Sequence, residues 1–179
     1  MDALALVLIF GTRGLVPLLI FRWPFWGGLL SIAADGFDTI IQDVLGAEPL
    51  RGHYHTADKL FDTYYLAIEA WVAFLWDDQL ARWTAVVLFA WRAAGVVFFE
   101  FTEARATLLV TPNIFENFFL FVAGLRTADP AWRVRTPERL LGIVLLVGAP
   151  KVLQEYAMHY RAFQTWHFVR DEIILFWKV

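Results

Sequence analysis

The chain has 179 residues, of which 59% are hydrophobic and 18% are charged, with nine tryptophans, seventeen phenylalanines and no cysteine. Soluble domains carry about 25% charged residues, and roughly a third of their unfolded surface stays in contact with water after folding. This composition therefore favours an α-helical integral membrane protein over a soluble enzyme, a disordered chain or a disulfide scaffold. The net charge of −3 argues against a nucleic-acid partner.

Six segments are long enough to cross a bilayer if each carries one or two charges. They cover about 3–21, 25–45, 60–76, 83–101, 106–125 and 140–158. A plain spanning helix needs about twenty mostly apolar residues, whereas the longest run without a charge, 23–34, has twelve. We therefore predict an all-α, polytopic membrane bundle of about six transmembrane helices over residues 1–160, with charges inside nearly every helix.

Prolines and glycines support these boundaries. Pro24 can begin the second helix, where its missing N–H is not needed. The glycines and proline of 46–52 predict a loop before the third helix, and 126–139 is the longest polar connector. Pro112 and Pro150 fall inside the fifth and sixth segments. We expect a kink at each, which membrane helices tolerate when neighbouring groups bond the freed carbonyls.

The last residues, 161–179, have a different pattern. Phe163, Trp166 and Ile173 belong to an apolar stripe that recurs at three- and four-residue intervals. Such a stripe predicts an amphipathic C-terminal helix on the membrane surface, although a helix packed on the end of the bundle fits the pattern equally well.

Charge at the helix ends gives a weak signal for topology. Six Lys and Arg residues fall on each side of a six-span bundle, but the arginines of 126–139 are concentrated in one short loop. That loop is predicted to be cytoplasmic, with both termini on the other side. We expect a multi-pass protein of the plasma or inner membrane of a prokaryote. Its partner is the lipid bilayer, and the sequence leaves its oligomeric state open.

Polar residues within the predicted spans recur on one face of each helix. The stripe of the second span is Ser31, Asp35, Asp38 and Gln42, and that of the third is Asp58, Asp62, Tyr65 and Glu69. Lys151, Glu155 and His159 form a similar stripe in the sixth. A charge at the centre of a bilayer costs about 2.5–3.5 kcal/mol on insertion scales, so these stripes are predicted to face the interior of the bundle.

Acids outnumber bases among the deep residues. The acids are Asp35, Asp38, Asp62, Glu69, Glu116 and Glu155, and the bases are Arg13, Arg92 and Lys151. Surplus buried carboxylates must be protonated, hydrated or bound to a cation. We therefore predict an ion-binding or substrate-binding site made of Asp35, Asp38, Asp62, Glu69, Arg92 and Glu116. The alternative is that Arg13 and Arg92 form structural ion pairs, and that Lys151 pairs with Glu155 one turn away.

A metal site is a further hypothesis. His53 and His55 lie two residues apart in the loop before the third helix, near several carboxylates. Two imidazoles with carboxylates can bind a divalent metal. The simpler interpretation is that both histidines are solvated, and no other cofactor is indicated.

Three functions fit these features. The first is a small carrier or channel for protons or cations, in which the acidic stripes form the site. The second is a membrane-embedded enzyme that acts on a lipid or isoprenoid substrate, with carboxylates as general acid and base or as metal ligands. The third is a non-catalytic subunit of a membrane complex. Whether the chain is an enzyme stays open, since no hydrolase or phosphate-binding motif occurs.

Overall fold

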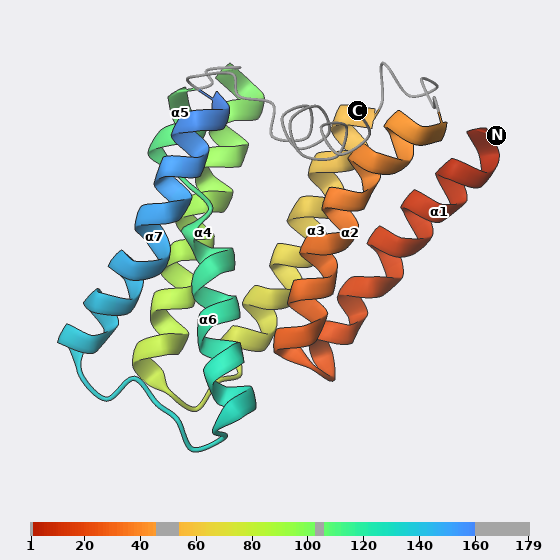
Figure 1. The fold of residues 1–179 in the computed structure, drawn as a ribbon. Coiled ribbons are helices and arrows are strands. Elements are labelled where there is room, and N and C mark those ends of the chain that lie inside the picture. Colours follow the sequence, from red (N-terminus) through yellow and green to blue (C-terminus); the bar gives the residue numbers. More distant parts are fainter. Residues whose placement is uncertain (1, 46–53, 103–105, 160–179) are drawn as a thin grey trace, which may run out of the picture.

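The computed structural model describes residues 2–45, 54–102 and 106–159, and every regular element among them is a helix. In order these are α1 (Asp2–Leu15), the 3₁₀ helix η1 (Val16–Phe21), α2 (Pro24–Leu45), α3 (Tyr54–Phe74), α4 (Gln79–Thr102), α5 (Ala106–Val110), α6 (Ile114–Ala128) and α7 (Pro137–His159). The all-α prediction is confirmed. The helices run alternately down and up, so the start of α1 and the end of α7 lie at the same end of the bundle (Figure 1). The predicted C-terminal helix lies outside the described residues.

The fifth predicted segment differs from expectation because its proline separates two helices. α5 ends at Val110 and α6 begins at Ile114, so residues 111–113 form a break and not a kink. Pro112 lacks an N–H, and its ring disfavours helical geometry at the preceding Thr111. By contrast, α7 continues through Pro150.

Two side chains fix helix starts at the end of the bundle that carries the connector. Asp78 precedes α4, and its carboxylate accepts a hydrogen bond from the backbone N–H of Ala81 at 3.2 Å. Thr136 precedes α7 and accepts from the N–H of Arg139 at 3.3 Å, with Pro137 as the first helical residue. Each is an N-cap that satisfies an amide the helix cannot bond.

α6 lies at the centre of the bundle and packs against α2, α3, α4 and α7. Its side chains Phe115, Phe118, Phe119 and Val122 are all fully buried. The ring of Trp76 stacks on Phe119 with a centroid distance of 5.6 Å. Since full burial of one such side chain contributes about 1.5–3 kcal/mol, this helix organises the core.

The loop between α3 and α4 fixes the connector between α6 and α7. Asp77 is bonded by Arg126 at 2.7 Å and also by Arg133, and Asp78 accepts from the backbone N–H of Val134 at 2.6 Å. The hydrogen bond from Arg126 is the main reason that the pKa of Asp77 falls to about 2. One acidic loop therefore holds two positions of the arginine-rich connector.

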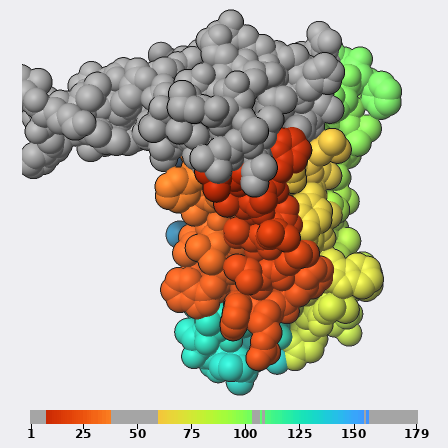
Figure 2. All heavy atoms as spheres, turned by 90° about the vertical axis from the view of Figure 1, so that its right-hand side faces the viewer, coloured from red at the N-terminus to blue at the C-terminus, as the bar shows by residue number. Residues whose placement is uncertain are grey.

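Large apolar side chains are exposed on most of the helices. They include Leu18, Leu29, Trp71, Val97 and Leu145, and Figure 2 shows the face on which α1 lies in front of α2 and α3. Within the described residues, α4 is the one helix long and apolar enough to cross a membrane, with 24 residues.

Tryptophans gather near one end of the bundle. Trp23, Trp26, Trp71 and Trp83 lie at the start of α2, the end of α3 and the start of α4, and each is more than half exposed. The sequence places all four near helix ends, as an interfacial aromatic belt requires. Trp76 has the same sequence signal but is buried in the core.

Candidate functional site

The first polar cluster joins α1, α2 and α3 through Arg13. Its guanidinium lies 2.7 Å from a carboxylate oxygen of Asp35 and 2.5 Å from one of Asp62. The Arg13 side chain is 3% exposed, whereas those of Asp35 and Asp62 are 45% and 44% exposed. The arginine also lies over the ring of Phe61, at 5.5 Å. A buried cation thus holds two carboxylates that remain open on their outer side.

The second cluster is closed and centres on Glu69 of α3. This side chain is fully buried, and neither of its carboxyl oxygens has a hydrogen-bond partner among the described residues. The charged group that acts on it is Glu116 of α6, which has the same sign. A buried carboxyl group without a donor is costly to ionise, because no polar group replaces the lost water.

Glu116 has the partners that Glu69 lacks. Asn113, at the start of α6, donates its side-chain N–H to Glu116 Oε2 at 2.5 Å, and Lys151 Nζ of α7 lies 4.0 Å from the same oxygen. The hydroxyl of Tyr65 and the positive charge of Arg92 also act on this carboxyl. Glu116 is therefore held by polar groups from α3, α6 and α7, which keep it beside Glu69.

The break at 111–113 is held by side chains of α4. Arg92 donates to the carbonyl of Thr111 at 2.9 Å, and the indole N–H of Trp91 donates to that of Val110 at 3.3 Å. These bonds satisfy carbonyls that a continuous helix would have used. Gly95 faces the same place, where an added Cβ would lie 1.8 Å from Thr111 Oγ1. The discontinuous helix is thus fitted to α4.

α7 is tied to α6 near its own proline. Asn117 donates its side-chain N–H to the carbonyl of Val147 at 3.2 Å. Pro150 cannot donate to the carbonyl of Leu146, and its ring loosens the turn to which Val147 belongs. The part of α7 around Pro150 therefore lies next to the position that brings Lys151 to Glu116.

Tyr65 lies between the open and the closed clusters. It is buried on α3, one helical turn before Glu69. The carboxyl groups of both clusters act on its hydroxyl, namely Glu116, Glu69, Asp62 and Asp35. Because both groups of carboxyls act on it, Tyr65 is the polar side chain that connects them.

The residues predicted for the site therefore fall into two neighbouring clusters. Asp35 and Asp62 share Arg13, whereas Glu69, Glu116 and Arg92 lie in the closed cluster. Asp38 lies on α2, but its side chain is outside the described part, as is that of His55, and His53 is not described at all. Among the described side chains, no group of three His, Cys, Asp or Glu could hold a metal ion.

Three residues that lie next to Glu69 or Glu116 were not among the predicted site residues. Tyr65 and Lys151 stand on the polar stripes, so the spacing contained a signal for both. Gly28 had no such signal: it lies against the closed cluster, where an added Cβ would be 2.9 Å from Glu69 Oε1 and from Leu120 Cδ2. The carboxyl of Glu69 thus fits closely between α2 and α6.

Comparison with protein-family models, with curated proteins and with solved structures finds no match to this chain.

Proposed function

We propose that this chain is a polytopic integral membrane protein that carries protons through the carboxyl pair Glu69 and Glu116. The bilayer location is supported by the length of α4 and by the large apolar side chains exposed on the outer faces of most helices. It is also supported by the inward position of Arg13, Glu69 and Glu116, all of which are buried. Ionisable residues inside a membrane bundle usually mark a path for ions or protons.

The observation that carries the proposal is the isolation of Glu69. It is fully buried without a hydrogen-bond partner in the described part of the chain, beside a second carboxyl group. The cations Lys151 and Arg92 act on Glu116 and not on Glu69. A carboxyl group in this position is stable when it binds a proton or a cation, and it is unstable when it is ionised without a donor or a counter-ion.

A proton fits this position better than a hydrated ion does. Gly28 brings the backbone of α2 so close that even a methyl group would touch Glu69 Oε1. Metal ions such as Mg²⁺ keep several waters and need more oxygen ligands than two carboxyl groups supply. A proton needs neither space nor additional ligands.

A route to the pair runs through Tyr65. The half-exposed carboxylates of Asp35 and Asp62 can exchange protons with water, and Tyr65 lies between them and Glu116. Its hydroxyl acts on the carboxyl of Glu116, and a hydroxyl can both donate and accept. The proposed route therefore leads from Asp35 and Asp62 through Tyr65 to Glu116 and Glu69.

The test is proton flux into vesicles. Full-length protein is reconstituted into liposomes that contain a pH-sensitive dye, and a pH gradient is applied across the membrane. We expect Glu69→Gln and Glu116→Gln to lower the flux about tenfold or more, because an amide keeps the shape of the carboxylic acid but cannot carry a proton. The matched control is Glu138→Gln, at the exposed start of α7.

Three outcomes separate the functions considered. Flux that depends on Glu69 and Glu116 but not on Glu138 supports the proposal. Equal flux in all variants contradicts it. Wild-type vesicles that move no protons refute it as well, and they favour the enzyme if lipid is turned over or the subunit if it is not. Circular dichroism and size exclusion show beforehand that each variant is folded.

A further inference from the structure

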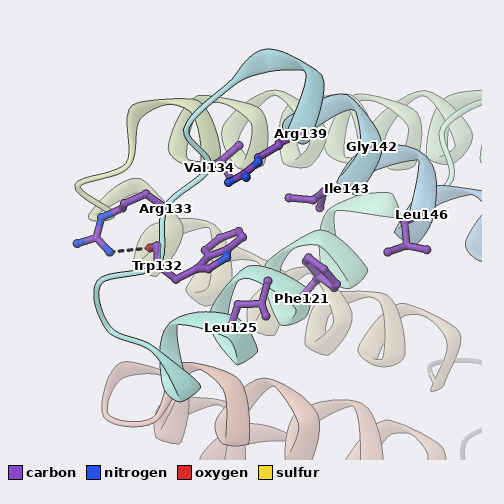
Figure 3. A pocket seen from close by; sticks show the side chains of 9 residues that line it. All are labelled: Phe121, Leu125, Trp132, Arg133, Val134, Arg139, Gly142, Ile143 and Leu146. Atoms are coloured by element: carbon purple, nitrogen blue, oxygen red, sulfur yellow. Dashed lines mark hydrogen bonds between the residues drawn. The ribbon is translucent and has the colours of Figure 1, made fainter.

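A cavity of about 310 Å³ lies between α6, α7 and the connector, and neither member of the carboxyl pair lines it. Its apolar walls come from Phe121 and Leu125 of α6 and from Ile143 and Leu146 of α7, as Figure 3 shows. Gly142 also lines the cavity, and an added Cβ there would meet no atom within 4 Å. The cavity is thus a largely apolar space in which α7 leaves room beside α6.

Two arginines line the same cavity in different ways. Arg133 is already bonded to other groups: it bonds Asp77 of the α3–α4 loop, and it donates to the carbonyls of Pro130 and Trp132 in the connector, both at 2.7 Å. In Figure 3 its guanidinium points away from the other lining residues, whereas that of Arg139 lies beside Val134, over the cavity. Arg139 is exposed, and no carboxylate of the described residues pairs with its side chain. One cation is therefore available at the apolar cavity.

The position of the cavity in the bundle suits the surface of a membrane. It lies at the end where the connector and the exposed Trp23, Trp26 and Trp83 are found. Tryptophans prefer the headgroup level of a bilayer, and arginines between helices on the cytoplasmic side bind anionic headgroups. We infer that the cavity binds one anionic phospholipid, with its phosphate at Arg139 and the start of an acyl chain along Phe121 and Leu146. This inference rests on the proposed bilayer location but not on proton transport.

The lining selects a lipid over a free anion. Phosphate alone would contact Arg139 and would leave the apolar walls wet, whereas a phospholipid covers both parts at once. The charge of Arg139 favours an anionic headgroup over a zwitterionic one, because no described carboxylate forms an ion pair with it. Since Arg133 is paired with Asp77, Arg139 is the arginine that provides the preference for an anionic headgroup.

The experiment compares lipids on the purified full chain in detergent. Native mass spectrometry counts bound phosphatidylglycerol and phosphatidylcholine with identical acyl chains. We expect phosphatidylglycerol to be retained preferentially, and Arg139→Gln to lower its retention about tenfold, since the charge-assisted hydrogen bond to the phosphate is lost. The matched control is Arg135→Gln, which is exposed on the same connector but does not line the cavity; it should change retention less than about twofold.

A second variant tests the apolar part. Gly142→Leu keeps both arginines and fills the cavity, so it should lower retention of both lipids. Equal losses in Arg139→Gln and Arg135→Gln would overturn the site, and so would competition by glycerol phosphate as effective as by the whole lipid. Loss of lipid preference with proton flux intact refutes only the lipid site, and lost flux with lipid preference intact refutes only proton transport. A chain that stays monodisperse without detergent contradicts the bilayer location itself.

Discussion

The two polar clusters of this bundle solve the same electrostatic problem in opposite ways. In the open cluster, the buried Arg13 binds Asp35 and Asp62 directly, and both carboxylates keep contact with the outside. In the closed cluster, Glu69 is fully buried, and no cation of the described residues lies against it. Ion pairing and water stabilise charge in the first, whereas only protonation or ion binding can do so in the second. The open cluster therefore resembles a structural clamp, and the closed cluster resembles a site that changes its charge.

The largest expected difference between the two regions is in the stability change caused by replacing a glycine with alanine. Gly95→Ala would place a Cβ 1.8 Å from Thr111 at the closed cluster, whereas Gly36→Ala beside Asp35 would meet no atom within 4 Å. We expect Gly95→Ala to destabilise the fold by about 3 kcal/mol, as strong overpacking does. Gly36→Ala should be neutral or slightly stabilising, because alanine favours a helix more than glycine does. Thermal unfolding in detergent, followed by circular dichroism, measures both, and equal melting temperatures would show that the break is not fitted to α4.

Removing the clamp has the next largest expected effect. Arg13→Gln leaves Asp35 and Asp62 side by side without their shared cation. Breaking a fully buried pair costs about 3–5 kcal/mol, and we expect about 2 kcal/mol here because both carboxylates are half exposed. Protonation removes the repulsion, so the deficit should shrink as the pH falls toward about 4. Chemical unfolding at two pH values checks this, and a deficit that does not change with pH would contradict a role in pairing.

The smallest effect is expected at Asp77, where one acid has two arginines. Its pKa is lowered to about 2, first by the hydrogen bond from Arg126, against an ordinary value of 3.8. Its contribution to stability is thus complete above about pH 4 and is lost as the pH falls toward about 2. We expect Asp77→Asn to lower the melting temperature slightly at pH 6 and to match the wild type at the acid end of this range. A difference that persists there would assign the effect to packing.

Much of the architecture could be predicted from the sequence because helical periodicity is a local property. The segments 25–45 and 83–101 match α2 and α4 closely, and the polar stripes of Asp62 and Glu69 do face other helices. The partners of these residues could not be predicted in the same way. Which carboxylate Arg13 reaches depends on how three helices cross, and spacing along one helix does not contain that information.

The break at Pro112 shows the same limit. The proline itself was visible in the sequence, but a kink and a break differ in whether nearby groups can bond the freed carbonyls. Arg92 and Trp91 supply those bonds from a helix about 20 residues earlier in the chain. Gly28 and Gly95 gave no signal either, because a close approach between helices depends on their packing and leaves no periodic trace.

The contact between Gly95 and Thr111 constrains how this chain can change over time. An alanine at 95 is compatible with the break only if the side chain at 111 becomes smaller, for example glycine. The two positions should therefore be substituted together or not at all in descendants that retain a discontinuous helix. A lineage that straightens the helix, by replacing Pro112, is released from this coupling and can accept larger residues at 95.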